Sequence, residues 1–182
     1  MVYIIYILTL THRAEISISP YTFFRRRAEP TMRLTTFSDY SLRVLMYLGV
    51  HAERLTTIAE IGRAYGISQN HLMKVVHHLA QCGYIETARG KAGGMRLARS
   101  PEKINVGEVV RGTEENLTLV ECFDNATSDC RIDSACALKG ILSRAVDAFF
   151  AVLERYTLAD LLVTKPKLAT ILVLSDARLR RG

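Results

Sequence analysis

Three cysteines lie close together in the sequence, and their spacing has the clearest chemical meaning in the chain. Cys122, Cys130 and Cys136 are separated by seven and then five residues, with Asp, Asn, Thr and Ser side chains between them. Those residue types favour loops over regular secondary structure. Three thiols on one loop can converge on one point, as a soft metal centre requires of its thiolates. We therefore interpret residues 122–136 as an iron–sulfur ligand loop.

Other functions remain open for the same residues. Structural zinc usually takes cysteines about two to four residues apart, and the chain has no such pair. A thiol–disulfide switch needs no metal, and two of the three cysteines could pair. We expect no enzyme, because the sequence contains no nucleotide-binding loop and no Ser/His/Asp arrangement that we can place. A pure protein-interaction module would leave the basic turn described below unexplained.

The charge is divided between two parts of the chain. Residues 33–104 hold ten Lys/Arg and five Asp/Glu, a net of +5, whereas residues 105–163 hold five Lys/Arg and ten Asp/Glu, a net of −5. A basic part followed by an acidic part that carries the cysteines is typical of a nucleic-acid-binding module joined to a sensing module. The fourth cysteine, Cys82, stands apart, and we expect it to be a small buried apolar residue.

Four regions follow from the composition. We expect residues 1–31 to be a disordered extension or an upstream reading that the cell does not translate, because no amphipathic period fits them and a more regular sequence begins at Met32. Their apolar run, residues 2–10, is too short to span a bilayer. Residues 32–104 are predicted to bind DNA, residues 105–163 to carry the cysteines and a dimerisation helix, and residues 164–182 to form a basic tail. Without a recognisable signal peptide, we expect a cytoplasmic protein with no membrane partner.

Helix start and stop signals predict three helices between residues 38 and 82. Ser38 is the expected N-cap of the first helix. Thr56 or Thr57 caps the second, since Glu60 lies three residues after Thr57 and completes a capping box. Ser68 caps the third helix, which ends at Gly83. The tight turn that separates the second helix from the third makes the pair a candidate helix-turn-helix.

Two short alternating segments, residues 84–88 and 95–98, follow the third helix and resemble strands. The turn between them is basic and rich in glycine, which permits positive φ and close backbone approach to phosphates. A strand, a basic tip and a second strand after a helix-turn-helix predict a winged helix. The fold class is therefore expected to be mainly α, with a two-stranded wing.

Two groups of residues are the candidate DNA contacts. Polar residues in the first half of the third helix can contact base edges, and the wing can reach phosphates or a narrow minor groove. These candidates are Ser68, Gln69, Asn70, His71 and Lys74 on the helix, and Arg89, Lys91, Gly93 and Gly94 on the wing.

A long amphipathic helix is predicted after the cysteines. From Ala135 to Tyr156, apolar residues recur three or four positions apart over about six turns. Such a helix has little left in its own chain to pack against, so we expect it to form a homodimer. Asn105 and Thr157 are the expected N-caps of shorter helices on either side.

Taken together, these pieces resemble the Rrf2 family of winged-helix regulators. The likeness covers about residues 33–163. It is carried by Met32-x-Leu34-Thr35-x-Phe37-x-Asp39-Tyr40-x-Leu42-Arg43, Tyr65-Gly66-Ile67-Ser68-x-Asn70-His71-Leu72-x-Lys74, Arg89-Gly90-Lys91-x-Gly93-Gly94, the cysteine loop with Cys136-Ala137-Leu138-Lys139, and Tyr156-Thr157-Leu158-Ala159-Asp160-Leu161.

The resemblance implies a homodimer that binds a palindromic operator and carries one iron–sulfur cluster, 2Fe-2S or 4Fe-4S, in each subunit. The three cysteines would be joined by a fourth ligand that is not cysteine. In the nitric-oxide-sensing members this ligand is an aspartate near the start of the first helix, contributed by the other subunit, and the matching residue is Asp39. A simpler alternative to cluster ligation is that Asp39 stabilises the first turn of its helix and pairs with Arg43.

One position separates two branches of the family. Members that regulate cluster biogenesis use a histidine three residues after the last cysteine, where this chain has Lys139, a poor ligand. The likeness therefore favours a nitric-oxide-sensitive repressor that leaves its operator when the cluster is nitrosylated. The alternative is an iron–sulfur or thiol-based redox regulator of another regulon, such as cluster supply or cysteine metabolism.

Overall fold

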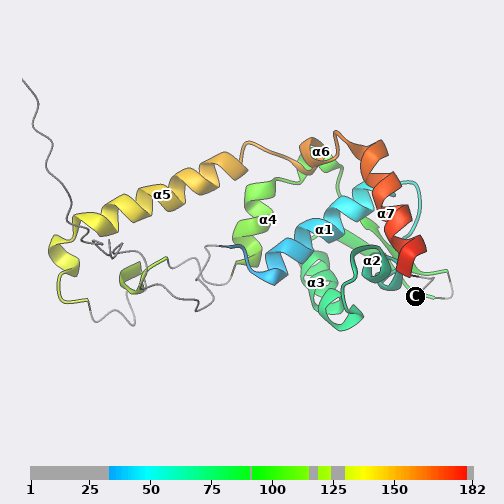
Figure 1. Ribbon diagram of the computed structural model, residues 1–182, viewed down its shortest axis with the longest axis horizontal. Helices are drawn as coiled ribbons and strands as arrows, with labels where there is room; N and C mark the ends of the chain where they lie inside the picture. Colours follow the sequence, from blue (N-terminus) through cyan, green and yellow to red (C-terminus); the bar gives the residue numbers. More distant parts are fainter. Residues whose placement is uncertain (1–32, 91, 115–118, 124–129, 180–182) are drawn as a thin grey trace, which may run out of the picture. The chain divides into compact units, whose positions relative to one another are not determined.

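The computed structural model describes residues 33–90, 92–114, 119–123 and 130–179 (Figure 1). From Leu34 onward these residues belong to one compact unit. The described part is mainly helical and contains a two-stranded antiparallel sheet, as predicted. The expectations for residues 1–31 lie outside the described residues.

Helix α1, Thr36–Val50, begins earlier than the sequence analysis predicted. Thr35, not Ser38, is the N-cap, and its Oγ1 accepts a hydrogen bond from the backbone N–H of Ser38 at 3.2 Å. The Ser38 side chain is fully buried, and its Oγ lies 2.8 Å from Oγ1 of Thr113. Both hydroxyl residues suit a cap, but Ser38 is engaged by a residue that lies far away in the sequence.

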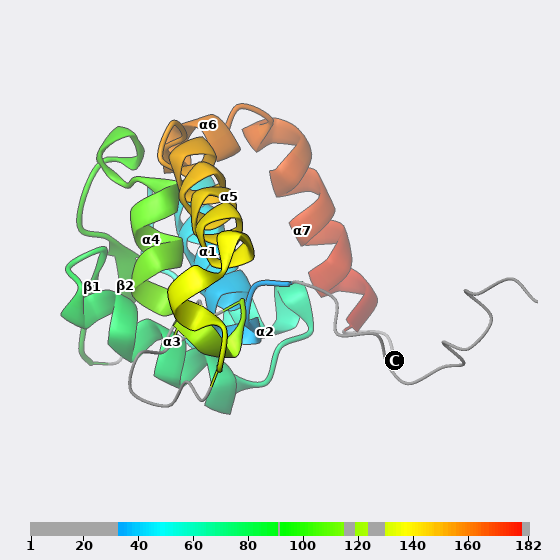
Figure 2. The ribbon, with the colours of Figure 1, turned by 90° about the vertical axis from the view of Figure 1, so that its left-hand side faces the viewer.

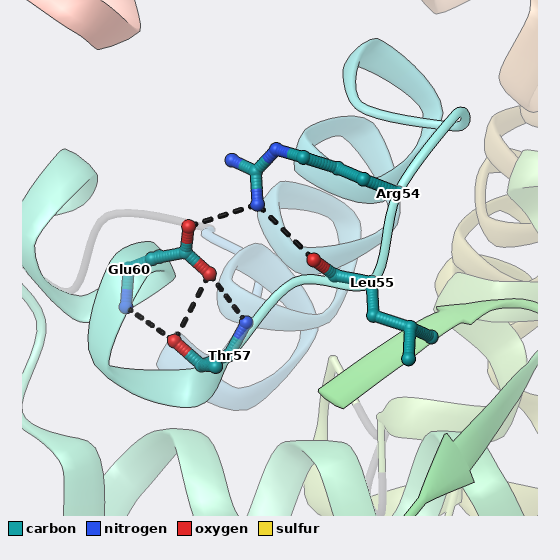
Figure 3. A network of polar contacts seen from close by, with 4 residues as sticks. All are labelled: Arg54, Leu55, Thr57 and Glu60. Carbon is teal, nitrogen blue, oxygen red and sulfur yellow. Dashed lines mark hydrogen bonds and ion pairs between the residues drawn. The ribbon is translucent and has the colours of Figure 1, made fainter. Parts of the chain in front are cut away.

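Helix α2, Ile58–Tyr65, is held at its start by the predicted capping box (Figure 3). The Glu60 carboxylate accepts from the backbone N–H of Thr57 at 2.7 Å, and the Thr57 hydroxyl accepts from the Glu60 N–H at 3.3 Å. Arg54 Nη1 donates to the same carboxylate at 2.8 Å. Gly66, with φ of 66°, ends the helix in the left-handed region.

Helix α3, Gln69–Gln81, starts at its predicted N-cap Ser68. Strands β1, Ile85–Ala88, and β2, Gly94–Leu97, follow it and pair in antiparallel register, with Ile85 opposite Leu97. Backbone hydrogen bonds in both directions between Thr56 and Met95, of 3.0 and 2.8 Å, attach the sheet to the segment before α2. The wing is therefore fixed to the helix-turn-helix by main-chain bonds.

The main core forms around α1, which runs through the middle of the unit (Figures 1 and 2). Helices α3, α4 (Val106–Thr113) and α6 (Leu158–Leu161) and strand β2 pack against it. The fully buried side chains of this core include Val44, Leu45, Ile61, Leu72, Leu79 and Leu158. Helix α3 is thus packed in one core with residues from both ends of the described chain.

Helix α5, Ala137–Leu153, ends at Leu153, one turn earlier than predicted. A second apolar cluster of Val106, Val110 and Phe150 packs its C-terminal half on α4. Asn105 is the N-cap of α4, as predicted, and its Nδ2 donates to the Glu154 carbonyl at 2.7 Å. The end of α5 is therefore tied to the start of α4.

The segment predicted as a basic tail contains a helix, α7, Lys165–Leu179. It packs against α2, and Leu172 is buried in the main core. The apolar run from Leu168 to Leu174 forms part of this helix. Three short 3-10 turns complete the described elements: Pro101–Lys103, Glu121–Phe123 and Asp133–Ala135. In the part of the chain that the structure describes, every helix is too short or too polar to cross a membrane.

Candidate metal centre and nucleic-acid interface

The three clustered cysteines lie on the connection between α4 and α5. Cys122 is in the 3-10 turn Glu121–Phe123, Cys130 precedes the turn Asp133–Ala135, and Cys136 is the N-cap of α5. All three are free thiols; Cys122 is buried and the other two are partly exposed. Residues 124–129, between the first two cysteines, lie outside the described residues.

The described residues do not assemble a metal site. Among them, no three His, Cys, Asp or Glu side chains lie close enough together to hold an ion. The donor set nevertheless fits an iron–sulfur cluster, because it offers three free thiols on one connection, whose described residues contain no regular structure longer than a 3-10 turn. The assignment of the three cysteines as ligands stays a prediction.

Lys139, in the first turn of α5, brings a positive charge to this connection. Its Nζ lies 2.8 and 2.9 Å from the two carboxylate oxygens of Asp133. The hydrogen bond with Asp133 raises the pKa of Lys139, and the charges of Asp133, Cys122 and Cys130 raise it further. The Lys139 amine is therefore engaged by a carboxylate of the same connection.

Asp39, the candidate fourth ligand, is paired within its own chain. Its two carboxylate oxygens accept from Arg43 Nε at 3.0 Å and Nη2 at 2.8 Å. The same guanidinium lies over the rings of Tyr40 and Tyr65, at 6.0 and 5.8 Å. In the single chain, Asp39 thus forms the ion pair with Arg43 that the sequence analysis gave as the simpler alternative to cluster ligation.

A polar junction that the sequence analysis missed joins the start of α1 to the end of α4. The backbone N–H of Thr35 donates to Glu114 Oε1 at 2.7 Å, and the buried hydroxyls of Ser38 and Thr113 are bonded to each other. Glu114 directly follows α4 and leads into the connection that carries the cysteines. No local pattern could have revealed these contacts, because the partners are more than 70 residues apart in sequence.

Helix α3, the second helix of the candidate helix-turn-helix, presents the predicted polar residues to solvent. Its apolar residues Leu72, Val75, Val76 and Leu79 are buried. Ser68 acts as a cap, accepting from the His71 N–H at 3.4 Å. The side chains of Gln69, Asn70, His71 and Lys74 are exposed. These residues are therefore available for contact with DNA, and their role in it stays a prediction.

The backbone conformation and close contacts within the chain require glycine at the wing tip. Gly90 has φ of 108°, and the N–H of Gly93 donates to its carbonyl at 2.9 Å. A Cβ atom at Gly94 would lie 2.9 Å from the Thr56 carbonyl oxygen. Arg89 is exposed beside this turn, whereas Lys91 lies outside the described residues. The tight turn accounts for Gly93, and the close approach of the Thr56 backbone accounts for Gly94, without any contact to DNA.

The expectation that Cys82 is buried is wrong. Cys82 is exposed, and its Sγ lies 3.6 Å from Nε2 of His78. It is the C-cap of α3, where the buried face of the helix has already ended at Leu79. At the end of a helix, the helical repeat of apolar residues no longer predicts that a side chain faces the core.

Comparisons with known proteins place this arrangement among bacterial regulators. A profile described as "Rrf2: Iron-dependent Transcriptional regulator" matches residues 34–164. The chain is 49% identical over 148 residues to the "HTH-type transcriptional regulator NsrR" of Bacillus subtilis, covering 80% of this chain and all of that protein. It is 48% identical over 142 residues to the NsrR of Shouchella clausii, covering 78% of this chain and 95% of that protein.

A solved structure supports the same grouping. "CymR (YrzC) the Global Cysteine Regulator of B. subtilis" matches with a TM-score of 0.58 and 27% identity, over 71% of this chain and 95% of that one. This likeness confirms the predicted fold class. The predicted resemblance is confirmed too, and the names of the relatives bear out the expectation of a regulator rather than an enzyme.

Proposed function

Because the chain belongs to the Rrf2 family of transcriptional regulators, we propose that it is a nitric-oxide-sensitive repressor with one iron–sulfur cluster, 2Fe-2S or 4Fe-4S, per subunit. It binds operator DNA as a homodimer and is released when nitric oxide reacts with the cluster. The observation that carries the proposal is the set of three free thiols on the connection between α4 and α5.

Cys122, Cys130 and Cys136 hold the cluster, and Asp39 of the partner subunit supplies the fourth ligand. A bound cluster provides iron with a weak oxygen ligand, the kind of centre that nitric oxide attacks. Lys139 lies three residues after Cys136, and its amine is occupied by Asp133. The Asp39 carboxylate is partly exposed, so a second chain can reach it once Arg43 releases it.

The junction between α1 and α4 connects the cysteines to the DNA-binding half. Glu114 and Thr113 bond to the first turn of α1, the turn that also carries Asp39. Helix α1 in turn packs against α3 in the main core. A change in the cysteine connection therefore reaches the recognition helix through α1, and a small shift of the two recognition helices changes their half-site spacing.

Operator contact is assigned to α3 and the wing. Gln69, Asn70, His71 and Lys74 face the base edges from an N-terminal half that is exposed to solvent, beginning at the N-cap Ser68. Arg89 and Lys91 contact phosphates or the minor groove, and Gly93 and Gly94 let the backbone approach closely. The exposed apolar residues of α5, Leu138, Ile141 and Val152, form the dimer contact.

The proposal is tested by anaerobic purification of the full chain with iron and sulfide counts and a visible spectrum. Nitric oxide is then titrated into the protein while binding is followed on the duplex that the protein selects best from a random pool. We expect a coloured protein whose charge-transfer bands bleach in step with the loss of DNA binding.

Two results would point elsewhere. Bleaching without loss of DNA binding would remove nitric oxide as the signal and favour an iron–sulfur regulator of another regulon, such as cluster supply. A colourless protein that contains zinc or no metal, and whose DNA binding follows thiol oxidation, would favour the thiol-based alternative. The structural neighbour CymR is described as a cysteine regulator.

A further inference from the structure

One large apolar side chain is exposed where the winged half of the chain otherwise buries such residues. Met73, in the middle of α3, is 52% exposed. Among the described residues from 34 to 114, every other Leu, Ile, Val, Met, Phe and Tyr is buried or partly buried. The remaining exposed large apolar residues of the described chain lie at position 119 or beyond.

The helix geometry places Met73 among the candidate base contacts. It follows Asn70 by three positions and Gln69 by four, so the three side chains lie on one face, with Met73 one turn further along the helix. Lys74 is its neighbour, and His77, also exposed, follows one turn later. Met73 is therefore the apolar member of an otherwise polar, solvent-facing surface.

Packing within the described chain gives no reason for an apolar residue at this position. Met73 belongs to neither apolar cluster, whereas its helix neighbours Leu72 and Val75 are buried in the main core. A thioether has little to offer the donors and acceptors of base edges. The major groove of B-DNA presents one apolar group, the 5-methyl of thymine.

We propose that Met73 is a specificity-determining residue that contacts a thymine 5-methyl group in each half-site of the operator. The inference rests on the DNA-binding part of the proposed function and is independent of the cluster and its signal. The unbranched, flexible side chain of Met73 can follow the shape of the groove. Gln69 and Asn70 supply hydrogen bonds on the same face. The contact between Met73 and the methyl group therefore identifies thymine at a base pair that these two residues do not read.

The test uses the full-length protein and the best duplex selected from a random pool. Each thymine is replaced in turn by deoxyuridine, which removes only the methyl group. For the wild type, we expect replacement of one thymine in each half-site to weaken binding about three- to fivefold, the value of burying one methyl group. In Met73→Ala the same replacement is expected to have no effect, because the partner of the methyl group is gone.

Two controls separate this contact from other effects. Met73→Leu keeps an apolar side chain and should keep the deoxyuridine effect, whereas Asn70→Ala should weaken binding and still keep it. Met73 is half exposed, so Met73→Ala should unfold at the wild-type temperature.

Three results would overturn the proposal. A deoxyuridine effect of unchanged size in Met73→Ala would assign the methyl contact to another residue. A wild type that is insensitive to every replacement would show that no methyl group is read. Failure to select any duplex would contradict the DNA-binding part of the proposed function as well, and is thereby distinguished from a failure of the Met73 contact alone.

Discussion

The four cysteines differ in their surroundings, and this difference leads to a first prediction. Cys122, Cys130 and Cys136 lie on the connection between α4 and α5, whereas Cys82 is exposed at the end of α3. We expect Ala at any of the three clustered positions to remove the cluster, because each thiolate is one of few ligands. Cys82→Ala should keep it. Iron and sulfide per chain in anaerobic preparations measure the outcome, and equal loss in all four variants would contradict the ligand assignment.

A second prediction at the residue scale concerns the wing. Arg89 is exposed beside the Gly90 turn and is assigned to phosphate rather than to bases. Arg89→Ala should therefore weaken binding to all duplexes about equally and lower the slope of log K against log salt by about one. Lys167→Ala, which removes an exposed positive charge on α7, is the matched control and should leave the slope unchanged. An unchanged slope in Arg89→Ala would remove this residue from the phosphate contacts.

At the scale of elements, two glycines of α4 give a matched pair. A Cβ atom at Gly107 would lie 2.5 Å from Glu154 Cγ and 2.8 Å from its backbone N, where α5 ends against α4. Gly112, in the same helix, has open space around it. We expect Gly107→Ala to lower the free energy of unfolding by about 1–3 kcal/mol through this clash. Gly112→Ala should raise it by about 0.5–1 kcal/mol through helix propensity.

Urea unfolding measures both variants, and the sign is the critical readout. If Gly107→Ala is as stable as Gly112→Ala, then the end of α5 does not press against α4. The Arg111–Glu154 ion pair of 2.7 Å and the stacking of Arg111 over Phe150 at 3.9 Å hold the same contact one turn further along α4. A loosened α5 is also expected to weaken operator binding by the dimer.

The capping box of α2 leads to a prediction with a pH dependence. Burial raises the pKa of Glu60, but hydrogen bonds from Thr57 and the nearby Arg54 lower it more, so the net shift is downward from 4.5. A lowered pKa in the folded state stabilises the fold at pH values above 4.5, and this stabilisation is lost as pH falls through the folded pKa. Glu60→Gln should therefore cost about 1 kcal/mol at pH 7 and progressively less at acid pH.

Thermal unfolding across pH checks this sign. Glu53→Gln, which removes the charge of an exposed glutamate in the segment before α2, is the control. It should change stability little at pH 7 and at acid pH. A stability gap between wild type and Glu60→Gln that widens on acidification would contradict the role of the carboxylate in the cap.

Elements with local signals were predictable from the sequence, and elements joined by distant partners were not. The Thr57–Glu60 box, the Ser68 cap and the wing strands depend on residues within a few positions of one another, so a linear pattern contains them. The start of α1 was placed wrongly, because both Thr35 and Ser38 suit a cap and only Thr113 decides between them. Helix α7 was missed because its partner, α2, lies about a hundred residues earlier.

The candidate site divides in the same way. Residue types and spacing predicted the three cysteines and the exposed polar half of α3. The Glu114–Thr35 contact and the Lys139–Asp133 pair depend on folded geometry. The burial of a side chain at a helix end also cannot be predicted without the structure, which is why Cys82 was wrongly predicted to be buried.

At the scale of the whole molecule, the exposed apolar residues of α5 predict a dimer. Leu138 and Ile141 are 58% and 52% exposed at the start of this helix, which is otherwise attached through its C-terminal half. We expect Ile141→Asp to shift the protein to monomers and to abolish operator binding, since a charge cannot be buried cheaply in an apolar interface. Sedimentation velocity measures the oligomeric state.

A matched variant controls for a general effect of charge. Val163, 79% exposed between α6 and α7, lies outside α5, and Val163→Asp should leave the oligomeric state unchanged. Circular dichroism should show the same helix content for both variants. Monomers in both variants, or dimers in both, would contradict the assignment of α5.

The late position of the core residues Leu158 and Leu172 has a consequence for synthesis of the protein. Both side chains are buried in the same cluster as Leu72 and Leu79 of α3. A ribosome delivers the chain from its N-terminus, so the helix-turn-helix leaves the exit tunnel long before the residues that complete its packing. The cysteine connection is made in between. A nascent chain therefore exposes Cys122, Cys130 and Cys136 before the packing of α3 is complete.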